Sequence, residues 1–155
     1  MMIKTALALG GNLGDVAGAF RTAAQKLEAA GMINIKLSSF YRTSPVDCVP
    51  GTPDFLNAAL AGDWPGSAEE LFAVCQKIEC ESGRAAPHGI NTPRTLDLDI
   101  ILFGDRIINS DTLRIPHPRA PQRFFVIAPL VEIAPEMIFP DTGRKVSDIF
   151  KSLME

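Results

Sequence analysis

The chain has 155 residues, of which 46% are hydrophobic and 21% are charged, and its formal net charge is −3 at pH 7. This composition is typical of one globular domain and excludes a disordered chain, and the length suffices to bury a core without disulfides or structural metals. The negative net charge argues against a nucleic-acid partner, because affinity for phosphate backbones depends on clustered Lys and Arg.

No membrane partner is expected either. No apolar run approaches the ~20 residues that cross a bilayer, and the first residues lack the segments of a secretory signal. We therefore expect a cytoplasmic protein. The three cysteines, Cys48, Cys75 and Cys80, lack the paired C-x-x-C spacing of a zinc or redox site. We interpret Cys75 as a core residue and the other two as free thiols.

The first third of the chain predicts a strand, a helix and a second strand. Residues 3–9 are an apolar strand, and the glycines of residues 10–14 indicate a tight turn. Asp15 can cap the helix that follows, which ends near Gly31. The apolar positions of this helix lie on one face: Phe20, Ala23, Ala24 and Leu27. Residues 33–41 are rich in β-branched and aromatic side chains and predict the second strand.

Residues 42–53 form a Pro- and Gly-rich loop that is longer than the usual connection of ~4 to 6 residues. Long loops in compact domains carry function, although a tolerated surface insertion is the alternative. Residues 55–64 predict a third strand that contains the polar Asn57. Ser67 and Glu70 form a capping box that begins a second helix, which ends near Gly83. Its buried face consists of Leu71, Val74, Cys75 and Ile78.

The next segment, residues 93–103, alternates apolar side chains with Asp97 and Asp99 after an irregular stretch at residues 84–93. Successive side chains of a strand point to opposite faces, so both carboxylates share a face. Like charges placed together repel each other, which favours a hard divalent cation as their partner. The alternative is an edge strand that two exposed acids keep from aggregating.

The order strand, helix, strand, strand, helix, strand predicts an α+β fold of the ferredoxin-like βαββαβ type, an antiparallel sheet with helices. A C-terminal hairpin (residues 106–108 and 113–115) and two helices (residues 125–133 and 147–153) follow. We expect one domain over residues 1–155. Five arginines lie in sequence around the two aspartates, which makes a compact polyanion with a metal ion a plausible ligand: Arg84, Arg94, Arg114, Arg119 and Arg123.

Several motifs together resemble one family. They are S-S-F-Y-R-T-S-P at residues 38–45, P-D-F-L-N-A-A at 53–59, P-R-T-L-D-L-D-I at 93–100, and I-P-H-P-R, R-F-F-V and P-L-V-E-I-A-P in the last third. The order and spacing of these motifs are similar to those of 6-hydroxymethyl-7,8-dihydropterin pyrophosphokinases, the folate-pathway enzymes. The resemblance implies the ferredoxin-like fold and the transfer of pyrophosphate from ATP to the hydroxymethyl group of the pterin, with release of AMP.

The resemblance also implies the roles of individual residues. Asp97 and Asp99 would hold two Mg²⁺ ions that bridge the ATP phosphates, and Asp97 would also face the attacking hydroxyl. Catalysis would further use Arg84 and Arg94. The implied ATP site consists of Phe72, Gln76, Glu79, Arg84, Arg94, Ile100, His117 and Arg123. The implied pterin site consists of Thr43, Pro45, Val46, Phe55, Asn57, Asp97 and Phe125. From pattern alone, His117 would be a loop residue between prolines, and Phe55 and Phe125 would be core residues.

The chain departs from the family pattern before P-R-T. The best-known form carries R-x-R-x-x-x-R-W-G-P-R, whereas this chain has R-A-A-P-H-G-I-N-T-P-R at residues 84–94. Ala86, Ile90 and Asn91 replace two arginines and the tryptophan, and Pro118 follows His117 where an aromatic residue is common. Our hypothesis is that Arg114 and Arg119 compensate for the missing arginines.

Two other functions stay open at this point. A member of the family that binds nucleotide or pterin without catalysis would explain the missing arginines, although the two aspartates and Arg94 argue against it. A ferredoxin-like RNA-binding module would share only the fold, and the chain lacks the aromatic and basic strand of such modules. We expect a monomer whose partners are two small molecules, ATP and a pterin.

Overall fold

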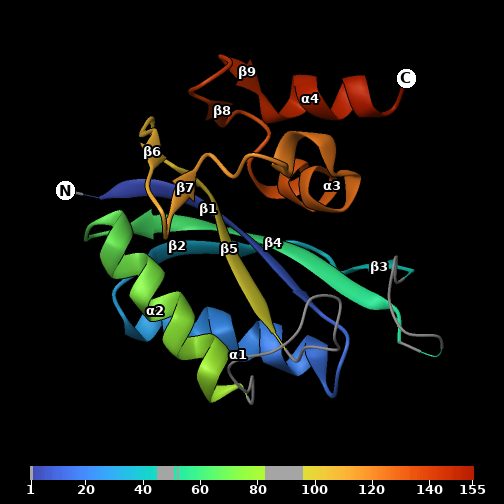
Figure 1. Ribbon diagram of the computed structural model, residues 1–155. Helices are drawn as coiled ribbons and strands as arrows, with labels where there is room; N and C mark the ends of the chain where they lie inside the picture. The colour runs from blue at the N-terminus through green and yellow to red at the C-terminus, as the bar shows by residue number, and fades with distance from the viewer. Residues whose placement is uncertain (1, 45–50, 52, 83–95) are drawn as a thin grey trace.

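A five-stranded sheet forms the middle layer of the computed structural model, which describes residues 2–44, 51, 53–82 and 96–155. Helices α1 and α2 cover one face, and α3 and α4 lie on the opposite side (Figure 1). The elements of these layers are β1 (Ile3–Gly11), α1 (Val16–Ala29), β2 (Ile33–Leu37), β3 (Tyr41–Thr43), β4 (Phe55–Trp64), α2 (Ala68–Glu81), β5 (Asp97–Phe103), α3 (Phe124–Ile133) and α4 (Val146–Leu153). The short remaining elements are β6 (Ile108–Asn109), β7 (Arg114–Ile115), the 3₁₀ helix η1 (Ala120–Gln122), β8 (Ile138–Phe139) and β9 (Arg144–Lys145).

The strands of the sheet follow the order β2-β4-β1-β5, and every neighbouring pair is antiparallel. The short β3 pairs with β4 as well. In the register of the central strands, Gly10 of β1 lies between Asn57 of β4 and Asp97 of β5. Because β5 pairs with β1 at the end of this order, its acidic segment lies at an edge of the sheet.

Both long helices begin at the predicted caps. The Asp15 carboxylate accepts a hydrogen bond from the Gly18 N–H at 3.0 Å. At the start of α2, the Glu70 N–H donates to Ser67 Oγ at 3.1 Å and the Ser67 N–H donates to the Glu70 carboxylate at 2.9 Å. These bonds satisfy backbone donors that the first turn of a helix leaves unpaired. The capping box and the predicted helices are therefore confirmed.

The predicted first turn was placed too early. Gly10 and Gly11 belong to β1 and continue its pairing with β4. The turn lies at the next residues, where Gly14 has a φ of +76°, a conformation that glycine adopts without strain. The buried Asn12 donates from Nδ2 to the Pro53 carbonyl oxygen at 3.2 Å, which ties this turn to the start of β4.

Residues 33–41, which we predicted as one strand, form β2 and β3 with a break between them. The break holds one more residue than the facing segment of β4, so the pairing cannot continue without a bulge. Ser38 occupies this place and is buried. Its N–H donates to the Ala59 carbonyl at 2.9 Å, and its Oγ accepts from the Ala59 N–H at 2.8 Å. The side chain thus substitutes for a regular ladder bond, which periodicity cannot reveal.

The C-terminal part contains the predicted hairpin and helices and one hairpin that was not predicted. Strands β6 and β7 pair as expected, and α3 and α4 each begin one residue before the predicted start. Strands β8 and β9 form a further hairpin closed by a bond from the Gly143 N–H to the Phe139 carbonyl at 2.8 Å. Two-residue strands are too short to show a hydrophobic period, so the pattern carried no signal for them.

The core has two parts, one on each face of the sheet. Leu7 and Leu60 belong to the cluster shared with α1 and α2, whereas Ala6 and Ala59 face α3. Small side chains on that second face let α3 approach the strands closely. Cys75 is 1% exposed and belongs to the first cluster, which confirms its predicted place in the core. Among the described residues, no helix combines the length and apolar character of a membrane span.

Candidate functional site

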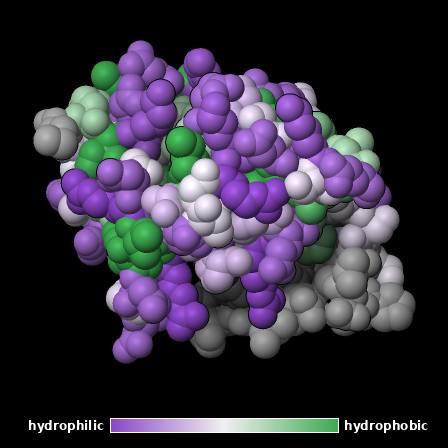
Figure 2. Space-filling view, turned by 90° about the horizontal axis from the view of Figure 1, so that it is seen from above, coloured by the Kyte–Doolittle hydropathy of each residue, from purple (hydrophilic) through white to green (hydrophobic). Residues whose placement is uncertain are grey.

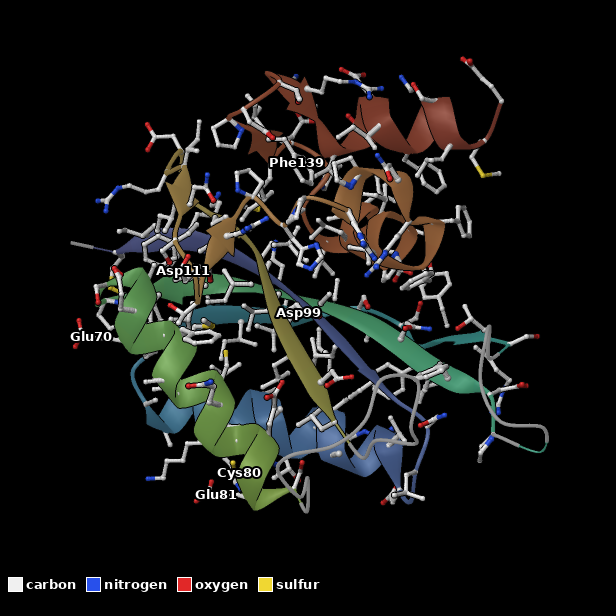
Figure 3. The ribbon with its side chains drawn as sticks, in the orientation of Figure 1. Glu70, Cys80, Glu81, Asp99, Asp111 and Phe139 are labelled. Carbon is white, nitrogen blue, oxygen red and sulfur yellow. The ribbon has the colours of Figure 1, made fainter. Side chains whose placement is uncertain are left out.

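Asp97 and Asp99 lie on the α3 side of the edge strand β5, as Figure 3 shows for the labelled Asp99. Their positions along the strand differ by two residues, which separates their Cα atoms by about 7 Å. Asp97 is half-buried and Asp99 is exposed. The prediction that both carboxylates share a face is confirmed. The strand is also an edge strand, as the alternative interpretation required, but its acids line cavities instead of an open surface.

The larger cavity has a volume of about 540 Å³ and lies between the sheet and α3. Its floor is formed by small residues of β1, because Ala8 and Gly10 present almost no side chain to it. Two aromatic residues, Phe55 and Phe125, contribute its apolar walls. The full lining is Ala8, Leu9, Gly10, Thr43, Ser44, Phe55, Asn57, Asp97, Asp99, Ile101, His117, Arg123, Phe125 and Val126. An acidic edge, a flat floor and aromatic walls suit a planar, partly polar ligand.

Asn57 is the buried polar residue of this cavity, and its neighbours fix its orientation. The Nδ2 group donates to Thr43 Oγ1 at 2.9 Å and points toward the Tyr41 carbonyl at 3.5 Å. A Cβ added at Gly10 would lie 3.5 Å from Asn57 Oδ1, so glycine leaves space in front of this oxygen. With its donors used on the β3 side, Asn57 offers Oδ1 as an acceptor to a ligand.

A second cavity of about 280 Å³ adjoins the first. It is lined by the first half of α2, the middle of β5 and the segment that connects β6 to η1. Its residues are Phe72, Leu98, Asp99, Ile100, Asp111, Thr112, Leu113, Arg114, His117 and Pro118. Figure 3 shows the labelled Asp111 in the β6–β7 region beside the beginning of α2. The mixture of an aromatic ring, aliphatic side chains and Arg114 suits a base attached to an anionic group.

The two cavities share Asp99 and His117. The Arg119 N–H donates to Nδ1 of His117 at 3.3 Å, so the proton of the neutral imidazole resides on Nε2. Burial lowers the pKa of His117, and the guanidinium groups of Arg123 and Arg119 lower it further, whereas the charge of Asp99 acts in the opposite direction. His117 is therefore a neutral donor at the junction of the cavities.

Arg123 lies beside the first cavity with its guanidinium carbon 5.7 Å from the centre of the Phe125 ring. A cation at this distance from an aromatic ring is attracted to its face. The contact orders the arginine next to the aromatic wall. Sequence reasoning placed Arg123 with the nucleotide, and the structure brings it to the boundary between the aromatic wall and the shared His117.

Most described residues of the predicted sites come together around these cavities. Phe72 and Ile100 line the second cavity, and Thr43, Phe55, Asn57, Asp97 and Phe125 line the first. Gln76 and Glu79 lie on α2 outside the lining of both cavities. Glu79 instead accepts a hydrogen bond from the Leu98 N–H at 2.7 Å. Other residues named in the sequence analysis lie outside the described part of the chain: Pro45, Val46, Cys48, Arg84, Ala86, Ile90, Asn91 and Arg94.

Sequence reasoning missed part of the lining. Thr112 and Leu113 occupy the turn of the β6–β7 hairpin, and Gly10 lies in β1 instead of a turn. The hairpin itself was predicted, but its position against α2 depends on contacts between distant segments. A signal existed for Gly10, because a glycine inside a strand marks a place where a ligand or backbone approaches closely.

Glu132, near the end of α3, holds the strand that leads into the first cavity. Its carboxylate accepts hydrogen bonds from the Ser39 N–H at 3.1 Å, from Ser39 Oγ at 2.7 Å and from the Tyr41 hydroxyl. Partial burial acts to raise the pKa of Glu132, but these bonds together hold it below its ordinary value. The same contact raises the pKa of Tyr41. Because Thr43 follows on β3, Glu132 links α3 to that wall of the cavity.

The fold and the cavities define a mixed α/β protein with an acidic strand edge between two cavities. A family model, described as 7,8-dihydro-6-hydroxymethylpterin-pyrophosphokinase (HPPK), matches residues 6–135. The chain is 35% identical over 142 residues to a 2-amino-4-hydroxy-6-hydroxymethyldihydropteridine pyrophosphokinase of Haemophilus influenzae, covering 91% of this chain and 88% of that protein. A protein with the same name from Bacillus subtilis is 39% identical over 132 residues, covering 84% and 78%. The chain belongs to the HPPK family.

Other relatives are much longer. A mitochondrial folate synthesis bifunctional protein of Arabidopsis thaliana is 40% identical over 140 residues, which is 90% of this chain but only 25% of that protein. The chain likewise spans 20% of a Pneumocystis carinii folic acid synthesis protein. Among solved structures, Plasmodium falciparum HPPK-DHPS with pteroate matches with a TM-score of 0.72 and 13% identity, covering 98% of this chain and 44% of that one. At this identity the match shows the shared fold.

Proposed function

We propose that this chain transfers pyrophosphate from ATP to the hydroxymethyl group of 6-hydroxymethyl-7,8-dihydropterin and releases AMP, as a step of folate biosynthesis. The single observation that carries this function is the junction of two cavities at Asp99 and His117, beside Asp97, in a chain of the HPPK family. A reaction between a nucleotide and a second small molecule needs two such sites that meet where the transferred group passes.

The pterin occupies the first cavity in this proposal. Its flat ring lies over Gly10 between Phe55 and Phe125, and Asn57 Oδ1 accepts hydrogen bonds from its amino edge. Asp97 and Asn57 flank Gly10 on neighbouring strands, which separates their Cα atoms by about 10 Å. This separation allows one end of the ring to be recognised by Asn57 while the hydroxymethyl group at the other end reaches Asp97. Pro45 and Val46 complete the site, as the family resemblance implies.

ATP occupies the second cavity, with its base near Phe72, Ile100 and Leu113 and its phosphates directed to the shared residues. His117 donates from Nε2 to a phosphate oxygen, and Arg123 neutralises charge from the other side. The family resemblance assigns further phosphate contacts to Arg84 and Arg94. Gln76 is the remaining nucleotide residue that this proposal keeps from the resemblance.

The donor set at the strand edge fits magnesium. Asp97 and Asp99 supply hard carboxylate oxygens, and among the described residues no three His, Cys, Asp or Glu side chains gather as a metal cage. Magnesium keeps several waters and is held by one or two carboxylates together with substrate phosphates, so two aspartates suffice. We propose that they hold two Mg²⁺ ions, whose chemistry is to neutralise the phosphate charge. Asp97 orients the hydroxyl, whose oxygen forms a bond to the β-phosphorus while the bond from that phosphorus to the bridging oxygen breaks; AMP leaves with that oxygen, and the hydroxyl proton is released to water.

We infer that the first six long elements follow the ferredoxin-like plan, which the antiparallel order β2-β4-β1-β5 supports. We also propose a single domain over residues 1–155 that acts as a monomer in the cytoplasm. Figure 2 shows that the face seen from above α4 is mostly hydrophilic with separated apolar spots, which supports the monomer for this face alone. A stable partner surface would need a continuous apolar area.

The test is incubation of the purified chain with MgATP and 6-hydroxymethyl-7,8-dihydropterin, followed by chromatography of both products. We expect AMP and diphosphorylated pterin in equal amounts, and neither when EDTA removes the divalent cation. Formation of ADP would contradict the proposed reaction. Tight binding of both substrates without any product would identify a member of the family that has lost catalysis.

A further inference from the structure

Glu79 of α2 makes an unusual contact with the strand that carries the two aspartates. Its carboxylate accepts a hydrogen bond of 2.7 Å from the backbone N–H of Leu98. Leu98 is the residue between Asp97 and Asp99, and its side chain is 5% exposed in the core shared with α2. The bond therefore attaches a helix side chain to the centre of the acidic segment.

The position of β5 explains why this bond matters. Among the described strands, β5 lies at the edge of the sheet and pairs with β1 on one side, so alternate backbone groups on its other side have no partner in a described strand. A half-buried backbone N–H without a partner costs free energy and leaves the strand free to shift. Glu79 supplies an ionised acceptor, which makes a stronger hydrogen bond than a neutral group does.

The side chains around Leu98 point in different directions. Asp97 and Asp99 face α3 and the cavities, whereas Leu98 faces α2 because successive side chains alternate. Glu79 approaches from the α2 side. Burial first, and then the negative charges of Glu79 and Asp99, together raise the pKa of Cys75 to about 12, so both carboxylates act on the same part of α2. A third carboxylate thus lies near Asp97 and Asp99, and its hydrogen bond ends on the backbone between them.

We propose that Glu79 is a positioning residue that holds the Leu98 backbone and thereby sets the direction of the Asp97 and Asp99 carboxylates, instead of contacting the nucleotide. This inference rests on the proposed function for the role of the aspartates. Within the described chain, Glu79 lines neither cavity, whereas Phe72, nearer the start of the same helix, lines the second one. The helix therefore faces the nucleotide near its beginning and fixes the acidic strand near its end. A displacement of ~1 Å in a catalytic group lowers rates by as much as about 100-fold.

Three variants separate the possible roles. Glu79→Ala removes the acceptor, Glu79→Met removes it while keeping the length of the side chain, and Glu79→Gln keeps a carbonyl oxygen that still accepts from Leu98. Glu69→Ala is the matched control, since Glu69 is exposed in the first turn of the same helix. Circular dichroism first establishes which variants are folded.

The first measurement is amide hydrogen exchange at Leu98 by NMR in the protein without metal or nucleotide. We expect the Ala and Met variants to exchange about 10- to 100-fold faster at Leu98, as the loss of a hydrogen bond to a charged group predicts. The Gln variant and the Glu69→Ala control should stay near the wild-type rate. Unchanged exchange in a folded Ala or Met variant overturns the proposal, and this result does not depend on whether the chain is active.

The second measurement is the Mg²⁺ concentration that gives half-maximal turnover, together with KM for ATP. The Ala and Met variants should need about tenfold more Mg²⁺ and lose turnover, and the Gln variant should recover most of both. An increase in KM for ATP alone, equal in all three variants, would instead show that Glu79 contacts the nucleotide. If the wild type lacks the proposed activity, Mn²⁺ binding in the presence of a non-hydrolysable ATP analogue replaces turnover as the readout.

Discussion

Asp99 and His117 come from distant parts of the chain and, within its described part, are the residues that line both cavities. Asp99 reaches this place from the middle of β5. His117 reaches it from the segment between β7 and η1, where its N–H donates to the Ile101 carbonyl at 3.2 Å. One carboxylate and one neutral imidazole donor are thereby held at the point where a nucleotide and a second substrate would meet.

Replacing His117 with alanine should lower turnover. The imidazole is oriented by the Arg119 N–H and presents Nε2–H to the junction, and the pKa lowered first by burial keeps it neutral. A hydrogen bond to a charged phosphate is worth about 1.5–3 kcal/mol, so kcat should fall about 10- to 100-fold. Steady-state AMP release measures this. Wild-type turnover in a folded variant would remove His117 from the mechanism.

Removing either aspartate should abolish activity and leave the fold intact. Asp97→Ala and Asp99→Ala each leave one carboxylate for the cation, and turnover should fall at least about 1,000-fold. The melting temperature should be unchanged or slightly higher, because repulsion between two like charges is relieved. AMP release and calorimetry test both statements. Loss of folding would show that the acids have a structural role.

Phe125 and its neighbour Phe124 offer a matched pair of substitutions. Phe125 lines the first cavity, whereas Phe124 stacks on Phe150 with ring centres 6.0 Å apart and is 46% exposed. Stacking of a base on an aromatic side chain is worth about 1–3 kcal/mol. Phe125→Ala should therefore weaken pterin binding about 5- to 150-fold in titration calorimetry, and Phe124→Ala should leave it unchanged. Equal effects of the two variants would contradict the assignment of the aromatic wall.

Arg114 and Arg119 should differ in their effect on ATP. Arg114 lines the second cavity, whereas Arg119 lies outside the lining of both cavities and orients His117 through its backbone N–H, which alanine retains. Arg114→Ala should raise the Kd of ATP about tenfold, and Arg119→Ala should raise it less. The measurement is fluorescence titration with a labelled ATP analogue. If neither variant changes the affinity, these residues do not compensate for the missing loop arginines.

Glu132→Gln should lower stability in a pH-dependent way. The pKa of Glu132 lies below its ordinary value in the folded chain, so its contribution is present above the ordinary pKa and is lost as the pH falls through the lowered one. The site is exposed, so the loss near about pH 7 should be about 1 kcal/mol or less. Urea unfolding should show this difference shrinking toward about pH 3. Glu136→Gln, which removes a surface ion pair with Lys145, is the control. A difference that persists at low pH would contradict the role of the charge.

Local sequence determined the elements that depend on neighbouring residues. The cap at Asp15, the box at Ser67 and Glu70, and the alternation of Asp97 and Asp99 each involve groups within three residues, and each is confirmed. The order of the elements also indicated the class of fold, because hydrophobic period and length distinguish strands from helices. The family resemblance also predicted that Phe55, Asn57 and Phe125 belong to one site, and all three line the first cavity.

Only the tertiary structure decided how distant segments meet. The break at Ser38 depends on the length of the facing strand, and the place of Gly10 depends on its register with Asn57 and Asp97. The bond from Leu98 to Glu79 joins a strand to a helix, so no local period can predict it. Strand pairing and helix packing depend on contacts between distant parts of the chain. The local sequence could therefore indicate Asp97 and Asp99, but only the tertiary structure shows the bond from Leu98 to Glu79 that holds their strand.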